Sequence, residues 1–315
     1  MFQGIKNGWG LIKESIKVFN HHPKFIVPLL ITWIIYAPII LYLKYWFNSD
    51  AYTTGQVFLI VLGIVFLFAF LLSFSCSMLL ELIQQLESGN KMSVTKAFGY
   101  TLGHNTIKIL PIVIVWTIIW FILLVIQALL SKDKKREKES FSAENAAKTL
   151  AGYGSFSFSR AFFEALQKGV RMVIFLILPA IAWENLGFWK ATKRGLGVFR
   201  AHLSVFVTGF VLTGLAAAIV FLPPALLFYI SDEMEIAFPD WVWVITIIYV
   251  AFAWSYSIYL EQMFIAELYL WNYKWEKEVA KAQQEGRPIP SLKDVPRPSV
   301  LDDVPDLINK AVIPV

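Results

Sequence analysis

The sequence predicts an all-α integral membrane protein with six transmembrane helices. Hydrophobic residues occupy 57% of its 315 positions and charged residues only 16%, whereas a soluble globular protein carries about 25% charged residues. Several runs with little or no charge are long enough to cross a bilayer core of about 30 Å, which takes roughly 20 helical residues. Because lipid offers the backbone no hydrogen-bond partner, we expect these runs to be helical.

The predicted spans follow the chain in order, and only the fourth is weak. Residues 172–183 offer 12 uncharged positions, about 18 Å of helix. We expect this segment to cross only if Lys168 and Arg171 extend toward the membrane surface at one end while Glu184 lies at the other. The six predicted spans are residues 25–47, 57–80, 109–130, 172–183, 204–230 and 241–260.

Basic residues mark the cytoplasmic side of a membrane protein, and here they favour both termini inside. Lysine and arginine recur in the N-terminal segment, before the third and fifth spans and in the tail, whereas residues 48–56 and 231–240 contain neither. One cluster opposes this topology, because residues 132–139 read KDKKREKE and would lie outside. Omitting the fourth span would instead place the basic residues of 190–200 outside, which fits the rule less well.

Short sequence matches indicate a threefold internal repeat. Displacing the chain by 180 positions aligns Trp9 with Trp189 and Lys13 with Lys193, and a displacement of 83 aligns further Lys, His, Pro and Trp residues. Each match precedes an odd-numbered span. We predict three parallel units, each a short amphipathic interfacial helix on the cytoplasmic side followed by two spans, and then a tail. The predicted boundaries are 1–86, 87–186, 187–282 and 283–315.

Acidic residues end the even-numbered spans, and basic residues of the short helices precede the odd-numbered spans. We expect these groups to make ion pairs or hydrogen bonds between repeat units, near the membrane surface rather than at its middle. Histidines just before the odd spans are expected to form hydrogen bonds at headgroup depth. The predicted contact residues are Glu81, Glu184, Glu261, Glu267, Lys13, Lys96, Lys193, His22 and His202.

The sequence lacks the usual signatures of catalysis and of cofactor binding. It contains no phosphate-binding glycine loop, nucleophile elbow, H-E-x-x-H motif or dinucleotide fingerprint. Its four histidines include no pair spaced for a shared metal ion. We therefore predict a protein that is not an enzyme, with no catalytic residue, no metal and no cofactor. An enzyme would require the acids or histidines named above to converge on a cavity.

Two segments fall outside the predicted spans. Residues 131–169 form a loop, predicted to be extracytoplasmic, in which 144–150 has the composition of a short helix. The tail from residue 286 holds six prolines and a repeated Asp-Val-Pro triplet at 294–296 and 303–305. Two interpretations of the tail stay open: an extended cytoplasmic segment that does not fold alone, or a peptide that docks on a partner or on the protein's own inner face.

Two stretches resemble uncharacterised bacterial six-helix membrane proteins, a group similar to the membrane domain of glycerophosphodiester phosphodiesterases. They are residues 8–15, GWGLIKES, and residues 178–196, LPAIAWENLGFWKATKRGL. The resemblance covers about residues 1–275 and implies a six-helix fold in the bacterial inner membrane. It implies no reaction, because the catalytic domain of those phosphodiesterases has no counterpart in this chain.

Three function hypotheses follow. The first is a non-enzymatic membrane protein that organises lipids or partner proteins at the cytoplasmic face. The second is a transporter or lipid-translocating protein, which would need a polar, water-accessible cavity at bilayer depth. The third is a membrane-embedded enzyme. The expected partners are membrane lipids, a protein that binds the tail at residues 286–315, and further copies of the chain in a homo-oligomer; nucleic acid is not expected.

Overall fold

The computed structural model describes residues 2–130, 140–153, 158–291 and 294–296, and in these ranges the chain is helical, with no β-strand. Single-turn elements η1 (Pro23–Ile26) and η2 (Ser49–Ala51) precede α2 and α3. The helices are α1 (Phe2–His21), α2 (Val27–Tyr45), α3 (Thr54–Glu87), α4 (Val94–Tyr100), α5 (Thr106–Leu130), α6 (Ala143–Leu150), α7 (Phe158–Ala182), α8 (Phe188–Ala201), α9 (Leu203–Glu233) and α10 (Asp240–Gln284).

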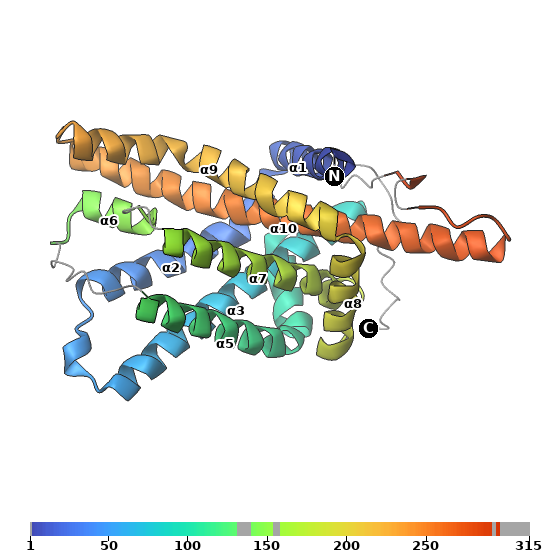
Figure 1. Ribbon diagram of the computed structural model, residues 1–315, viewed down its shortest axis with the longest axis horizontal. Helices are drawn as coiled ribbons and strands as arrows, with labels where there is room; N and C mark the ends of the chain where they lie inside the picture. The colour runs from blue at the N-terminus through green and yellow to red at the C-terminus, as the bar shows by residue number, and fades with distance from the viewer. Residues whose placement is uncertain (1, 131–139, 154–157, 292–293, 297–315) are drawn as a thin grey trace.

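Six helical segments are long and apolar enough to cross a membrane, which confirms the predicted number. They run broadly along the long axis of the molecule in Figure 1. The chain therefore has the architecture of a multi-pass membrane protein. The six segments are Pro23–Tyr45, Thr54–Glu87, Val94–Leu130, Ala161–Ala182, Leu203–Glu233 and Asp240–Gln284.

The second short helix is continuous with the span that follows it. α4 passes through the π-helical segment η3 (Thr101–Asn105) directly into α5, with no residue outside a helix. Ser93 caps α4, because its hydroxyl accepts a hydrogen bond from the backbone N–H of Lys96 at 3.4 Å. The first and third short helices, α1 and α8, are separated from α2 and α9 by η1 and by a single bend at His202.

The fourth span is longer than predicted. α7 begins at Phe158, so residues 158–169 of the segment assigned to the loop 131–169 are helical. Lys168 and Arg171 lie in the middle of this helix rather than at its end. The expectation that both side chains extend toward the membrane surface is wrong, because both turn toward the carboxylate of Glu261 on α10.

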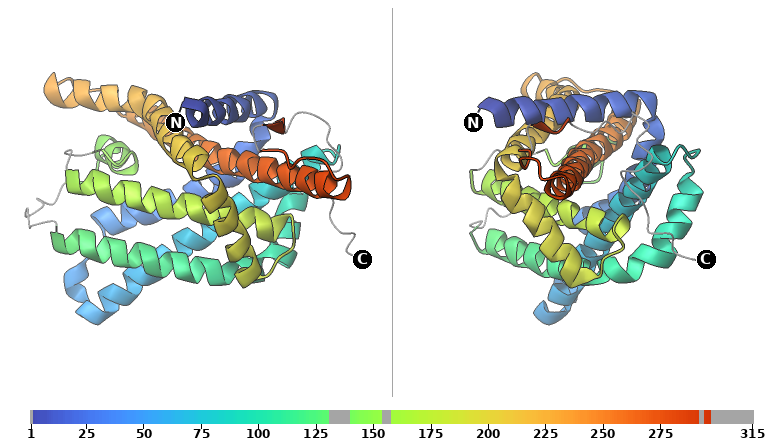
Figure 2. Two further views of the ribbon diagram at one scale, coloured as in Figure 1. Left: turned by 45° about the vertical axis from the view of Figure 1, so that its right-hand side comes forward. Right: turned by 90° about the vertical axis from the view of Figure 1, so that its right-hand side faces the viewer.

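The short helices α1 and α8 lie across the bundle near the end from which α10 extends. The right-hand view of Figure 2, which looks along the bundle, shows both running across it. α1 packs on α9 and α10, and α8 packs mainly on α7. Tyr259 of α10 fixes α1 in place, since its hydroxyl donates a hydrogen bond of 2.8 Å to the backbone carbonyl of Ser15.

Close packing of α9 on α10 depends on a small residue. Gly209 belongs to a series of small residues spaced by four, with Thr213 and Ala217, which predicts close helix contact. A Cβ atom at Gly209 would come within 2.1 Å of the ring of Phe264. The ring of Phe264 is fully buried, so α9 can take this position only with glycine there.

The connection between α5 and α7 contains the short helix predicted at 144–150, which the structure confirms as α6. α6 packs against α10 and α2, and its Ala147 is buried in one cluster with Phe228 of α9 and Trp243 of α10. The basic cluster at 132–139 lies outside the described residues, as does the second Asp-Val-Pro triplet at 303–305.

Candidate lipid groove and flanking polar contacts

An apolar groove of about 720 Å³ runs along α7, between α5 on one side and α8 and α9 on the other. It extends from Phe162 to Ile177, fifteen residues further along α7, which is about 22 Å of helix. Its remaining lining residues are Ile112, Val115, Ile119, Ala165, Leu166, Gly169, Val170, Val173, Ile174, Phe188, Thr192, Leu196 and Phe210.

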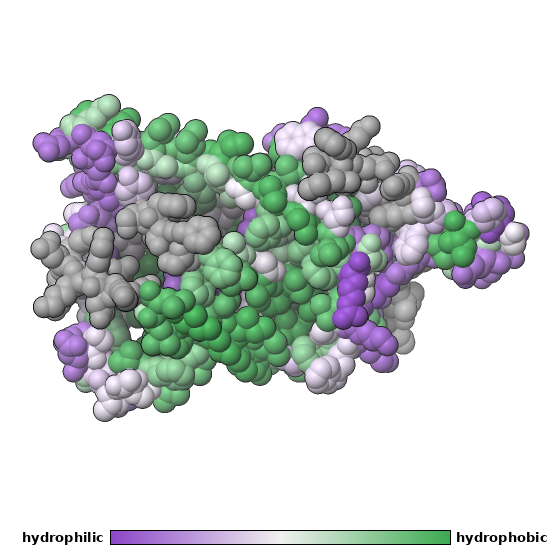
Figure 3. Space-filling view, in the orientation of Figure 1, coloured by the Kyte–Doolittle hydropathy of each residue, from purple (hydrophilic) through white to green (hydrophobic). Residues whose placement is uncertain are grey.

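The groove lies on the outside of the bundle. Its floor is buried, with Ile112 and Ile174 at 2% and 6% exposed, whereas its rim residues Phe162 and Val115 are about half exposed. The surface of α5 and α7 is almost uniformly hydrophobic in Figure 3. Thr192 supplies the one side-chain hydroxyl of the lining, and that oxygen is buried without a hydrogen-bond partner among the described residues.

Beside the groove, two cations of α7 share one carboxylate of α10. Arg171 donates two hydrogen bonds to Glu261, of 2.8 and 2.9 Å, and the ammonium of Lys168 lies 3.5 Å from the same carboxylate. The side chain of Glu261 is only 3% exposed. Lys168 also donates to the backbone carbonyl of Phe210 at 2.9 Å, and its ammonium lies 5.0 Å from the ring of Phe210, which lines the groove.

A second charged cluster joins α8 to α10. Arg194 donates to Glu184 at 3.0 Å and makes a two-bond contact with Glu276 at 2.7 and 2.6 Å. Tyr269 donates to Glu184 as well. Although burial lowers it, the hydrogen bonds to Glu276 and Glu184 raise the pKa of Arg194 above its ordinary value. This arginine therefore stays charged and holds α8 against the end of the bundle.

The two predicted histidines differ in environment. His202 is 7% exposed, and its Nε2 lies 2.6 Å from the amide oxygen of Asn272. Burial lowers the pKa of His202, and the bond to Asn272 offsets only part of that effect. His22 lies at the start of η1, where burial and the neighbouring His21 lower its pKa.

The described part of the tail docks on α10. The indole N–H of Trp275 donates to the carbonyl of Pro290 at 2.9 Å, and that of Trp271 donates to the carbonyl of Val295 at 3.0 Å. Val295 is 4% exposed and belongs to the main hydrophobic core. For residues 286–291 and 294–296, the structure thus shows the tail on the protein's own surface, which was one of the two open interpretations.

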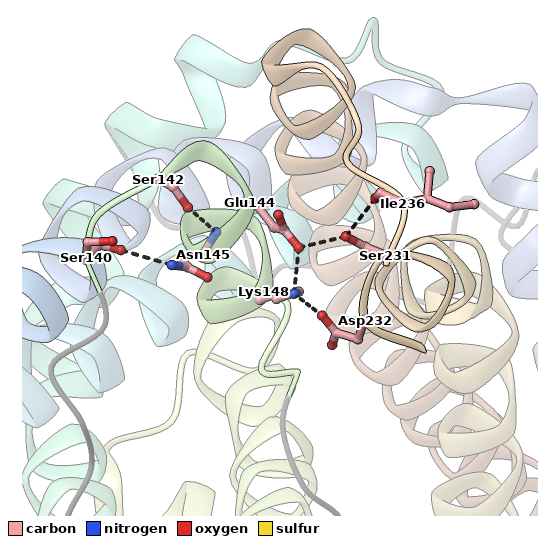
Figure 4. Close-up of polar contacts among 8 residues, drawn as sticks. All are labelled: Ser140, Ser142, Glu144, Asn145, Lys148, Ser231, Asp232 and Ile236. Carbon is pink, nitrogen blue, oxygen red and sulfur yellow. Dashed lines mark hydrogen bonds and ion pairs between the residues drawn. The ribbon is translucent and has the colours of Figure 1, made fainter. Parts of the chain in front are cut away.

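A polar network at the opposite end of the bundle fastens α6 to α9 (Figure 4). Lys148 makes ion pairs with Glu144, at 2.7 Å, and with Asp232. The hydroxyl of Ser231 donates to Glu144 at 2.8 Å. Burial raises the pKa of Glu144, but the bonds from Lys148 and Ser231 outweigh it and hold this pKa below the ordinary value. For Lys148, burial lowers the pKa, and its two carboxylate partners raise it overall.

The predicted contact residues are only partly brought together. Glu261 and Glu184 make ion pairs, but their partners are Lys168, Arg171 and Arg194 rather than the lysines of the short helices. The hydroxyl of Ser15 donates to Glu267 at 3.3 Å, which joins α1 to α10.

The remaining predicted residues lie as follows. Glu81 is buried on α3, at 6% exposed. Lys13 lies over the ring of Trp9, 5.7 Å from its centroid. Lys96 is exposed in the first turn of α4, and Lys193 is exposed on α8, where it lines a second pocket.

Sequence reasoning missed the groove, Asn272 and the role of Lys168 and Arg171 as ion-pair partners. The signal for those partners was present, because two cations three residues apart interrupt the weakest span while an acid ends another. Across the described part of the chain, no group of three or more His, Cys, Asp or Glu residues could hold a metal ion. No protein-family model, curated protein or solved structure matches this chain.

Proposed function

We propose that this chain is a non-catalytic, multi-pass protein of the bacterial inner membrane that binds a lipid acyl chain in the groove along α7 and so organises lipids around its cytoplasmic face. The observation that carries the proposal is the groove itself: about 720 Å³, open on the outside of the bundle and lined almost entirely by apolar side chains.

The position of the groove selects its occupant. α5, α7 and α9 are all long and apolar enough to span the membrane, so the rim of the groove faces the hydrocarbon of the bilayer. An acyl chain is the apolar ligand present there in bulk. The interior of the bundle is filled by one large cluster of buried side chains that draws on nearly every long helix. That packing favours lipid binding at the surface over a water-filled path.

The proposal includes an orientation and a repeat. Both termini lie in the cytoplasm, and α1, α4 and α8 are interfacial helices on that side, each opening one of three units of parallel repeat. The charge pattern and the sequence matches support both points. The proposed protein partners are a protein that binds through the tail, residues 286–315, and a second copy of the chain.

Gly169 provides a direct test, because it lines the groove and a Cβ atom placed on it meets nothing within 4 Å. Gly169→Leu extends a side chain into the groove, and leucine favours a helix over glycine by roughly 0.8–1 kcal/mol. We expect the variant to fold and to lose most of the lipid that the wild type retains, measured by native mass spectrometry after purification in mild detergent.

Gly63→Leu is the matched control. Gly63 is exposed on the membrane-spanning helix α3, has the same empty surroundings and does not line the groove. The control should retain lipid as the wild type does. Equal lipid content in all three proteins would contradict the proposal, and an equal loss in both variants would show that the retained lipid is a general annulus.

One observation favours lipid translocation as a second candidate. Lys168 belongs to the intramembrane charge cluster and contacts Phe210 in the groove lining, and intramembrane charges often mark transport paths. An assay of the purified protein in liposomes that contain a fluorescent lipid distinguishes lipid translocation from lipid binding alone. Faster lipid exchange between leaflets than in protein-free liposomes supports translocation, and an unchanged rate leaves binding alone.

A further inference from the structure

α8 lies at the membrane surface, whichever way the protein is oriented. It connects the end of one membrane-spanning helix, α7, to the start of another, α9, and it runs across the bundle (Figure 2). Trp189 projects from it with 80% of its surface exposed, as tryptophans do at the headgroup level of a bilayer. The polar side chains of α8 are therefore at the depth of lipid phosphates.

A pocket of about 480 Å³ lies between α8 and α10, next to the groove. Three cations line it, Lys190, Lys193 and Arg194, against one carboxylate, that of Glu276. Arg194 is held by Glu184 and Glu276. The ammonium groups of Lys190 and Lys193 are exposed and make no ion pair with any other residue that the structure describes. The pocket thus has two cations available for a ligand.

The groove and the pocket share α8. Thr192 and Leu196 line the groove, and the residues that follow each of them, Lys193 and Gly197, line the pocket. Because successive residues of a helix are about 100° apart, the two cavities flank the same helix on neighbouring faces. A lysine with a long flexible stem can cover an apolar surface while its ammonium reaches a phosphate.

We propose that the pocket between α8 and α10 binds the phosphate of an anionic phospholipid, so that α8 selects anionic lipids for the site whose groove holds the acyl chain. This inference rests on the proposed function and deepens it by naming the lipid class. The proposal rests on charge complementarity. The pocket has an excess of two cations at headgroup depth and lies beside a groove that fits an apolar chain.

The test compares headgroups at constant acyl chains. Full-length protein in mild detergent is incubated with an equimolar mixture of phosphatidylglycerol and phosphatidylcholine, and native mass spectrometry measures the ratio of the two lipids bound. Each basic residue near an anionic lipid surface contributes about 1 kcal/mol. The double variant Lys190→Gln/Lys193→Gln should therefore lower the phosphatidylglycerol preference by about thirtyfold while leaving total bound lipid unchanged.

Lys24→Gln/Lys91→Gln is the matched control, since it removes two exposed lysines outside the pocket. It should keep the wild-type ratio. An unchanged ratio in the α8 variant, or an equal fall in both variants, overturns the inference but leaves lipid binding standing. A wild type that retains neither lipid overturns the proposed function itself, and the groove variant Gly169→Leu reports on that separately through total lipid.

Discussion

Glu261 holds two cations of α7 inside the bundle, and removing its charge should destabilise the fold strongly. Its carboxylate accepts two hydrogen bonds from Arg171, of 2.8 and 2.9 Å, and lies 3.5 Å from Lys168. In Glu261→Gln both cations stay largely buried, and among the residues that the structure describes Lys168 keeps its hydrogen bond to the carbonyl of Phe210, whereas Arg171 loses its ion pair. Removing one partner of a buried ion pair lowers the free energy of unfolding by about 3–5 kcal/mol.

The same reasoning predicts that removing the whole cluster costs less than removing one member. Replacing a buried ion pair by apolar residues of similar volume is often neutral or stabilising. The triple variant Lys168→Met/Arg171→Met/Glu261→Met should therefore be more stable than Glu261→Gln. Glu278→Gln, on the extension of α10, lies away from the cluster and should change the free energy of unfolding by less than about 0.5 kcal/mol.

The assay is thermal unfolding of the purified protein in one detergent, followed by circular dichroism. A loss of 3 kcal/mol lowers the midpoint of a domain of 150–250 residues by at least about 6 °C, and a drop of roughly 5 °C is expected for this longer chain. The reasoning is refuted if Glu261→Gln melts within 1 °C of the wild type. It is equally refuted if the triple variant melts below the single one.

Three further outcomes follow from the structure. Gly209→Leu should reduce the yield of folded protein several-fold in size-exclusion chromatography, because even a Cβ there would come within 2.1 Å of the ring of Phe264. Glu144 has a lowered pKa, so its contribution to stability is present at neutral pH and is lost as the pH falls below about 4.5; Glu144→Gln should flatten the acid side of the stability profile, measured by thermal unfolding. Trp271→Phe and Trp275→Phe each remove one hydrogen bond to the tail, worth about 1 kcal/mol, and limited proteolysis should cut the tail faster in either variant.

The number of spans was predictable because hydropathy is a local property of the sequence. The length of α7 was not. Lys168 and Arg171 break its apolar run, and nothing within that run indicates that they are neutralised by Glu261, which lies 90 residues beyond Arg171. In a sequence, a lysine or arginine that is buried in an ion pair cannot be distinguished from one at the surface unless its partner is known. The predicted span therefore began too late, at residue 172, and the first half of α7 was assigned to the preceding loop.

The candidate site was also predictable only in part. Glu184 and Glu261 were predicted to make polar contacts between helices, and both do, but with Arg194 and Arg171 rather than with the lysines that were expected. Two acids at span ends are visible in a single sequence, whereas the choice of partner depends on how helices rotate against one another. The groove could not be predicted at all. It is formed by faces of four helices, and an apolar residue that lines it looks the same in the sequence as one that fills a core.

The charge cluster also explains how the least apolar spans can remain in the bundle. α7 and α10 share the lowest mean hydropathy of the six segments, 1.6, and each buried charge costs several kilocalories per mole in the bilayer core. Paired with each other, the charges of α7 and α10 offset much of that cost and fix the rotation of α7 about its own axis. This rotation directs Lys168 and Arg171 toward α10 and turns Phe162, Gly169 and Val173 outward. The ion pairs inside the bundle are therefore what presents the apolar face of α7 to the groove.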